Sequence, residues 1–564
     1  MASLLDNTYL KIGLRLAFIC FVLFVGYRIY KDVVVLRNTL SYDEAFHSLK
    51  GLLVADDLRN GDLVSLVYDS YRQVYFPPLY SLFTGLTFLI LPPNTVTAVV
   101  FSLVLFLLTA VVIYIAALEF DDHDGDWIAI IAAVLFLTSP ALIEYASRAM
   151  IEIAGLFILT LTFLIYFKLT KRPESLLLNF LFGLGIVVAY FMKSNYGVLL
   201  MIVTLIGLLI EVKFKLKRLL TRQILCFILP FIIAFVIWFA YPPKLISTWN
   251  ALVNSAWGVK DTYGVQGLLY YPRALVRISG SAWLFVILSL SFIVSIRFFR
   301  DKRIRYLILL ILVQLIIGQL HHTKLDRHIF PVLPALFLLT GFAFLKWWNW
   351  NLLGNRFVDF WFPRLATLIL LLYSTYFFFN ALTPIGLRIN TKVNDSVASL
   401  ISGDESTLVI STMWTKGLNP PALDWHLITD YHVLEVSQSG IAMNLIWDQR
   451  AANLTNRLDS IPLIESLLLP TLNRADMQSK SRTLSLGQPD YALYSQSQSG
   501  LHEYLLSMRK RWVFDKVVVV TTREPEAEYP LNYIDPTLQN MGFVLTFSED
   551  ISKNLLINEY TFQP

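Results

Sequence analysis

The stretch TVTAVVFSLVLFLLTAVVIYIAAL, residues 95–118, contains no charged side chain. A helix needs about 20 mostly apolar residues to cross the roughly 30 Å hydrocarbon core of a bilayer, so this stretch predicts a membrane-spanning helix. Similar apolar runs recur along the first two thirds of the chain. They predict a polytopic α-helical membrane protein with about eleven transmembrane helices, near residues 10–30, 95–118, 127–143, 149–168, 175–192, 195–211, 223–241, 282–299, 304–320, 328–345 and 364–383.

The composition supports this class. Of the 564 residues, 56% are apolar and only 15% are charged, and the mean hydropathy is +0.59. Soluble domains contain about 25% charged and roughly 45–50% apolar residues. The difference excludes a soluble enzyme, a disordered chain and a nucleic-acid-binding protein. Cys20 and Cys226 both lie in apolar runs, which indicates neither a disulfide framework nor a thiolate metal site.

Basic residues gather in alternate loops, which predicts the orientation of the chain. The formal net charge is +5, and Lys and Arg cluster at 168–172, 213–222, 297–305 and 346–364. These loops share one side, which the positive-inside rule makes cytoplasmic. The acidic loop 119–126 falls on the same side, as an exception of small weight. We therefore predict a multi-pass protein of the plasma (inner) membrane.

The predicted membrane domain covers residues 1–384. Its first outer loop, 37–94, contains the apolar run 76–91, which prolines bracket on both sides. At 1.5 Å per residue this run reaches only about 24 Å, which is short for a crossing. We predict that it forms an interfacial or re-entrant helix.

The tail, residues 385–564, loses the long apolar runs. Thr407–Ser411 and Lys516–Thr521 read as buried strands, and residues 458–472 and 501–511 read as helices. We therefore predict a C-terminal extracytoplasmic α/β domain.

Ionisable side chains at the predicted outer boundary are the candidate functional residues, because such groups are costly at membrane depth. They form four clusters on one side of the membrane. The clusters are Asp43 and Glu44 in SYDEAFH (41–47), Arg148 with Glu152, Lys193, and the run HHTKLDRH (321–328) with His321, His322, Lys324 and Arg327.

These residue types indicate one kind of chemistry. A carboxylate beside a bound hydroxyl acts as a general base, worth about 10²–10⁴-fold in rate, and clustered Arg and Lys hold a phosphate and stabilise its charge as it leaves. Arg148 and Glu152 are four residues apart, so a helix would place them on one face. A base, a cationic pocket and a membrane groove together indicate a lipid-linked phosphate as substrate.

Each cluster also has a structural interpretation. The carboxylates after the first span suit a solvated helix cap, and Arg148 with Glu152 suits an intramembrane ion pair. Lys193 suits a side chain that extends to the interface, and the adjacent histidines suit a solvated loop.

A divalent metal ion is a candidate cofactor. Asp43, Glu44, His321 and His322 offer suitable ligands if they converge. No HExxH, CxxC, P-loop or GxGxxG pattern occurs in a suitable context, so no other cofactor is predicted.

The order and spacing of these segments resemble the GT-C superfamily of integral-membrane glycosyltransferases, in particular the branch of protein O-mannosyltransferases and lipid A aminoarabinose transferases. The resembling segments are YDEA (42–45), YFPPLY (75–80), Ser139–Glu152, Lys193 and KLDRHIFPVLP (324–334). The family's His is absent before Pro77, and its usual Asp is Glu at position 152, so the sugar stays open.

The resemblance implies a helical membrane domain with interfacial helices in its first outer loop. It also implies inverting transfer of a sugar from a polyprenyl-phosphate or polyprenyl-diphosphate carrier at the outer leaflet. Asp43 would be the general base, and Glu44 would support it or bind acceptor or metal. The donor phosphate would be bound by Arg148, Lys193, Lys324 and Arg327. The remaining candidate substrate-binding residues are Tyr75, Tyr80, Glu152, His321 and His322.

Two other classes compete with an enzyme. A transporter of a lipid-linked or anionic solute would also have many spans, but such proteins usually carry internal repeats and sites near the bilayer midplane, and no repeat is visible. A sensor or scaffold would not need carboxylates and basic clusters at one boundary. The predicted partners are a polyprenyl-phosphate-linked sugar donor, a protein, lipid or polysaccharide acceptor, and membrane lipids, with no nucleic acid.

Overall fold

A computed structural model gives the structure of the chain, and the contacts within it divide the chain into two compact units. Unit 1 comprises residues 1–36, 99–240 and 250–385, and unit 2 includes residues 37–98 and 386–564. The structure describes residues 8–37, 39–72, 77–121, 125–215, 221–240, 263–321, 324–348, 356–382, 391–401, 406–411, 420–432, 482–485, 502, 505–506, 509, 514–522, 531–552 and 555–563.

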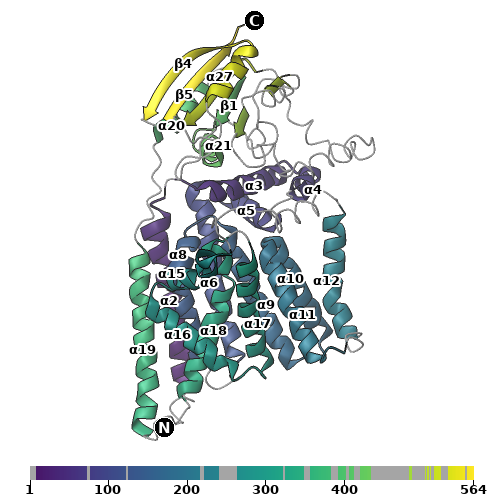
Figure 1. Cartoon of the computed structure of the whole chain (residues 1–564), viewed down its shortest axis with the longest axis vertical. Coiled ribbons are helices and arrows are strands. Elements are labelled where there is room, and N and C mark those ends of the chain that lie inside the picture. Colours follow the sequence, from purple (N-terminus) through teal and green to yellow (C-terminus); the bar gives the residue numbers. More distant parts are fainter. Residues whose placement is uncertain are drawn as a thin grey trace. The chain divides into compact units, whose positions relative to one another are not determined.

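Unit 1 is a bundle of helices, most of them apolar along their length (Figure 1). In chain order they are α2 (Thr8–Ile29), η1 (Tyr30–Val34), α6 (Thr95–Leu118), α7 (Gly125–Leu137), α8 (Pro140–Ala146), α9 (Ile151–Lys171), α10 (Leu176–Met192), α11 (Ser194–Glu211), α12 (Arg222–Phe239), α14 (Val265–Leu268), α15 (Tyr270–Ser279), α16 (Ala282–Ile296), α17 (Lys302–Leu320), η3 (Asp326–Ile329), α18 (Val332–Trp348) and α19 (Arg356–Ala381).

The helical, multi-pass membrane fold predicted from the sequence is confirmed. Among the described residues, seven helices are long and apolar enough to span a membrane, or up to nine if each of two bent pairs is one span. The bent pairs are α7 with α8, at 65°, and α15 with α16, at 110°. Every predicted span falls on a helix, but the count of about eleven is not confirmed, because α10 and α18 have only 17 residues each.

Contacts at one end of unit 1 explain the acidic exception among the basic loops. Glu119, just after α6, forms an ion pair of 2.8 Å with Lys171 at the end of α9. Asp126, in the first turn of α7, pairs with Arg15 at 3.0 Å and accepts a hydrogen bond from the Tyr114 hydroxyl at 2.7 Å. The acidic loop therefore neutralises cations at its own end of the bundle. The cytoplasmic assignment of that end stays a prediction.

Three short helices of unit 2 follow the first span. They are α3 (Tyr42–Arg59), α4 (Leu63–Arg72) and α5 (Leu79–Ile90). Helix α5 has 12 residues and is not among the candidate spans, as expected of an interfacial helix. It crosses α3 closely, because Gly51 and Gly85 face each other's helix. A Cβ on Gly85 would lie 2.5 Å from Val54 Cγ1 and 2.9 Å from the Gly51 carbonyl oxygen.

The C-terminal part of unit 2 is an α/β fold (Figure 1). Its five-stranded sheet has the order β2-β1-β3-β5-β4, with β1 parallel to β2 and β3, and β5 antiparallel to β3 and β4. Alternate strand residues enter two cores, which α20 and α21 cover on one face and α27 on the other. The elements are α20 (Thr391–Ile401), β1 (Thr407–Ser411), α21 (Pro420–Thr429), β2 (Arg482–Ser485), β3 (Lys516–Thr522), α27 (Leu531–Asn540), β4 (Phe543–Ser552) and β5 (Leu555–Phe562).

Both predicted strands are confirmed, as β1 and β3. Both consist mainly of β-branched and other apolar residues, which suit a strand buried on both faces. The helix predicted at 458–472 lies outside the described residues. Within 501–511, the four described positions (502, 505, 506 and 509) are helical.

The first outer loop groups with the C-terminal segment rather than with the membrane helices. Helix α21 packs on α3, and the ring of Trp425 lies 5.8 Å from that of Phe88 in α5. The buried His426 has Nε2 3.1 Å from Thr39 Oγ1. Because of these contacts, residues 37–98 belong to the same unit as the segment that starts at Gly386. The predicted division into domains at 384/385 stays a prediction.

We expect Gly85→Ala to destabilise the crossing of α3 and α5, because the added methyl group meets Val54 and the Gly51 backbone. Overpacking of this kind costs about 1–3 kcal/mol. The measurement is the thermal unfolding midpoint of the purified protein. Gly207→Ala in α11 is the matched control, since no atom lies within 4 Å of its added Cβ. Equal midpoints for the two variants would contradict the close crossing.

Candidate functional site

A break between α8 and α9 places the first candidate residues. Helix α8 ends at Ala146 and α9 begins at Ile151, so Arg148 lies in the connection and Glu152 in the first turn of α9. The expectation that one helix places Arg148 and Glu152 on one face is therefore wrong. Arg148 instead pairs with Glu144, with Nη2 2.5 Å from Oε1.

Glu152 is the buried centre of the site. Its side chain is 2% exposed, and Lys193 Nζ lies 2.6 Å from its Oε1. Arg327 Nε lies 3.7 Å from the same oxygen. Each partner also comes from a break between helices: Lys193 separates α10 from α11, and Arg327 lies in η3, before α18. Three helix ends thus bring together residues that are far apart in sequence.

Aromatic rings line this group of charges. Tyr145 lies within electrostatic range of Glu152, Arg327 and Arg148. Tyr196 packs against α9 at Gly155, where an added Cβ would lie 2.8 Å from the ring, and Lys193 Nζ lies 5.1 Å from the ring centroid. We name the Glu152 cluster as the set Tyr145, Arg148, Glu152, Lys193, Tyr196, His321, Arg327 and His328.

The two histidines complete the Glu152 cluster. His328 is within electrostatic range of Lys193, Arg327, His321 and Glu152, and its ring centroid lies 6.1 Å from that of His321. Of the sequence candidates, the structure therefore brings together Arg148, Glu152, Lys193, His321 and Arg327. Tyr145 and Tyr196 were not singled out from the sequence, because aromatic residues are common throughout the chain.

The Glu152 cluster holds buried polar atoms that lack partners. Among the described residues, Glu152 Oε2, Arg148 Nε and the Tyr196 hydroxyl have no hydrogen-bond partner. An unsatisfied buried group costs about 1–3 kcal/mol, and more when it is charged. One buried carboxylate also faces two cations, Lys193 and Arg327. An anionic ligand that also carries a hydroxyl group would balance the charge, accept from Arg148 Nε and donate to Glu152 Oε2.

Lys324 has a different environment. It is buried, and its ammonium donates to the carbonyl oxygens of Gly318, Gln319 and His321 at 3.2, 2.8 and 3.3 Å. An ammonium has three protons, so these bonds use all of them at the end of α17. The phosphate contact predicted for Lys324 is not supported by this geometry.

In unit 2, the start of α3 positions Asp43 and Glu44. Ser41 and Glu44 form a capping box, in which Glu44 Oε2 accepts from the Ser41 backbone N–H at 2.7 Å. The same oxygen accepts from Arg37 Nη2 at 2.7 Å, and both side chains are buried. The Glu44 carboxylate therefore stabilises the N-terminal end of α3 through these two bonds. Asp43 is the half-buried residue beside it.

Asp43 begins a polar stripe on α3. His47 and Lys50 follow at positions four and seven residues later, on the same helix face. Both are buried, and the His47 ring lies 5.5 Å from that of Tyr80 in α5. Lys50 Nζ lies 4.4 Å from the centroid of Phe46, and burial lowers the pKa of Lys50 to about 7. Tyr80, a sequence candidate, therefore contacts the helix that carries Asp43.

Two candidates, Tyr75 and His322, lie outside the described residues. Within the described ranges, no group of three or more His, Cys, Asp or Glu side chains is placed to hold a metal ion. Of the ligands suggested for a divalent metal, Glu44 already bonds to Arg37, and His321 belongs to the Glu152 cluster. The metal stays a prediction.

Comparison with known proteins identifies the fold. No protein-family model and no curated protein sequence matches the chain. ArnT from Cupriavidus metallidurans in the apo state superposes with a TM-score of 0.60 at 12% identity, over 97% of this chain and 98% of ArnT. ArnT bound to undecaprenyl phosphate gives 0.56 at 14% identity over the same shares.

A second protein gives the same result. The oligosaccharyltransferase AglB from Archaeoglobus fulgidus, in complex with an inhibitory peptide and a dolichol-phosphate, superposes with a TM-score of 0.50 at 10% identity, over 91% of this chain and 70% of AglB. ArnT and AglB are both members of the GT-C superfamily. The predicted resemblance is therefore confirmed at the level of the fold, which this chain shares with ArnT and AglB.

We expect Lys193→Met to lower stability by about 3 kcal/mol, because it leaves the Glu152 charge buried with only the more distant Arg327. The double variant Glu152→Gln/Lys193→Met should recover most of this loss, since it removes both charges. Lys302→Met is the control: its pair with Glu211 is exposed and is worth under about 1 kcal/mol. Unfolding midpoints measure all three, and equal losses in the single and double variants would contradict a buried pair.

Lys50 predicts a pH dependence of stability. In the unfolded chain its pKa is about 10.4, whereas in the folded chain it is about 7. Between these values the unfolded state binds the proton and the folded state does not, so stability rises with pH by up to about 1.4 kcal/mol per unit. Lys50→Met should flatten unfolding midpoints measured from pH 7 to 9.5, and Lys31→Met, at an exposed site, should not. Parallel curves for wild type and Lys50→Met would refute this.

Proposed function

We propose that this chain is an inverting glycosyltransferase that moves a sugar from a polyprenyl-phosphate carrier to an acceptor hydroxyl at the outer leaflet. The observation that carries the proposal is the buried Glu152 cluster, in which two cations face one carboxylate. The fold adds support, because ArnT has been solved with undecaprenyl phosphate and AglB with a dolichol-phosphate. Both of those ligands are phosphates on long apolar tails.

On the donor side, Lys193 and Arg327 bind the phosphate. Charge-assisted hydrogen bonds from Lys and Arg to phosphate are among the strongest in proteins. They strengthen as the sugar departs, because the phosphate gains negative charge in the transition state. The unpaired Nε of Arg148 can donate as well. Glu152 holds the two cations in place, and its free Oε2 accepts from a hydroxyl of the donor sugar.

On the acceptor side, Asp43 is the general base. It lies in the first turn of α3, where the positive end of the helix dipole stabilises a carboxylate. Glu44 positions it through the capping box and the Arg37 ion pair. The acceptor oxygen gives its proton to Asp43 and bonds to the anomeric carbon. The bond from that carbon to the phosphate oxygen breaks on the opposite face, which inverts the centre and releases polyprenyl phosphate.

The proposal also includes the setting of the reaction. We place the chain in the inner membrane with residues 386–564 on the outer side, from the loop charges. The acceptor is a protein, a lipid or a polysaccharide of the cell envelope. The identity of the sugar follows from turnover with a panel of donors.

The test measures released polyprenyl phosphate from protein in liposomes, with a panel of polyprenyl-phosphate sugars and a cell-envelope fraction as acceptor. We expect turnover with at least one donor. Asp43→Asn should lose at least about 10²-fold in turnover while its donor affinity stays unchanged. Arg327→Gln should weaken donor binding by about 10-fold or more, since a hydrogen bond to a charged group is worth about 1.5–3 kcal/mol.

Asp550→Asn is the control, because it makes the same change on exposed strand β4. Turnover that survives Asp43→Asn would move the base to Glu44 or Glu152. A wild-type protein that neither binds nor turns over any donor would overturn the enzyme assignment, and uptake of an anionic solute into the vesicles would then favour a transporter.

A further inference from the structure

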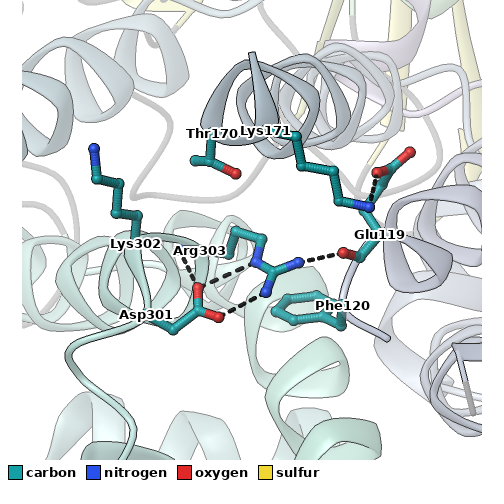
Figure 2. Close-up of a pocket in the computed structure, with 7 residues that line it drawn as sticks. All are labelled: Glu119, Phe120, Thr170, Lys171, Asp301, Lys302 and Arg303. Atoms are coloured by element: carbon teal, nitrogen blue, oxygen red, sulfur yellow. Dashed lines mark hydrogen bonds and ion pairs between the residues drawn. The ribbon is translucent and has the colours of Figure 1, made fainter. Parts of the chain in front are cut away.

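A polar pocket lies at the opposite end of α9 from the Glu152 cluster. It has a volume of about 450 Å³, which is within the usual range of small-ligand sites. Its lining comes from the ends of α6 and α9 and the start of α17 (Figure 2). From residue 152 to residue 171, α9 rises about 29 Å at 1.5 Å per residue, so the two sites are separated by the thickness of a bilayer core. The pocket is lined by Glu119, Phe120, Thr170, Lys171, Asp301, Lys302 and Arg303.

The floor of this pocket is held by Arg303. Its guanidinium pairs with Asp301 at 2.7 Å and donates to the backbone carbonyl of Glu119, as Figure 2 shows. The same guanidinium lies 5.4 Å from the centroid of Phe120. Arg303 is therefore fixed in position by α6 and by the turn before α17.

The rim of the pocket carries two exposed lysines. Lys171 is 43% exposed and pairs with Glu119 at 2.8 Å. Lys302 is 48% exposed and its Nζ lies 3.3 Å from Glu211. Solvent reaches both pairs through the lysines, whereas Glu119 and Glu211 are 18% and 30% exposed. Pairs near the surface are typically worth 0–1 kcal/mol, so an incoming anion can compete with the carboxylates for the two lysines.

The chain around the pocket is strongly basic. The lining itself has three basic residues, Lys171, Lys302 and Arg303, and two acidic ones, Glu119 and Asp301. Two segments that line or adjoin the pocket, 168–174 and 297–305, add to the positive charge. Their only acidic residues are Glu174 and Asp301, and their basic residues are Lys168, Lys171, Arg172, Arg297, Arg300, Lys302, Arg303 and Arg305. This excess of positive charge raises the local concentration of anions at the end of the spanning helices, which is where lipid headgroups lie.

We propose that this basic pocket binds the phosphate headgroup of an anionic phospholipid from the adjacent leaflet. Lys171 and Lys302 contact the phosphate, Arg303 forms the floor, and the acyl chains lie along the apolar flanks of the helices. A headgroup suits the site better than a soluble anion, because the pocket opens at the ends of helices α6, α9 and α17, all of them candidate spans. Basic pockets between transmembrane helices commonly bind such lipids. The site is independent of the glycosyltransferase proposal.

The test compares binding of phosphatidylglycerol and phosphatidylcholine to the purified full-length chain in detergent, by native mass spectrometry and by the shift in unfolding midpoint. We expect phosphatidylglycerol to bind and stabilise, and phosphatidylcholine not to. Lys171→Gln/Lys302→Gln should weaken phosphatidylglycerol binding about fivefold for each lysine, or roughly 30-fold in all.

Lys215→Gln/Arg222→Gln is the matched control: it removes the same charge at exposed sites, one after α11 and one at the start of α12. Equal weakening in both double variants would overturn the pocket, since only general surface charge would then matter. Equal binding of the two lipids would overturn anion recognition. If inorganic phosphate alone reproduces the stabilisation, and displaces phosphatidylglycerol at similar concentration, the ligand is a free phosphate and the lipid assignment fails.

Discussion

A carboxylate buried among membrane helices needs cationic partners, and the arrangement of unit 1 follows from that need. Glu152 has Lys193 at 2.6 Å and Arg327 at 3.7 Å, and each of the three residues lies at a helix end or a break. In an uninterrupted helix the backbone of the neighbouring turns would occupy the space that the partners from two other segments need. The breaks therefore bring these three charged residues together, and this is the group that we propose as the site for an anionic ligand.

Unit 2 also has a buried carboxylate with a cationic partner, at the start of α3. A buried ion pair between Arg37 and Glu44 and a capping box from Ser41 fix the helix end, while Asp43 stays half-buried beside them. The C-terminal segment adds a contact from His426 to Thr39, two residues before the cap. The segment that leads into α3 is thus held by the α/β layer of the same unit.

The two ends of α9 carry different electrostatics. At its start, one charged cluster is buried and holds unsatisfied polar atoms. At its end, the exposed Lys171 and Lys302 pair with the partly exposed Glu119 and Glu211. Burial strengthens electrostatic interactions and makes an unpaired group costly, so the first arrangement suits a specific ligand and chemistry. The second suits reversible contact with headgroups.

Hydropathy and loop charge were enough to predict a helical membrane protein, its apolar runs and the strands at 407–411 and 516–521, because these properties depend on local pattern. The sequence also located most of the charged residues that converge. It could not determine their partners: the local spacing of Arg148 and Glu152 predicted a pair, whereas the structure pairs Glu152 with Lys193 and Arg327. Pairing depends on where helices break and how they pack, and these are set by contacts between distant segments that only the tertiary structure decides.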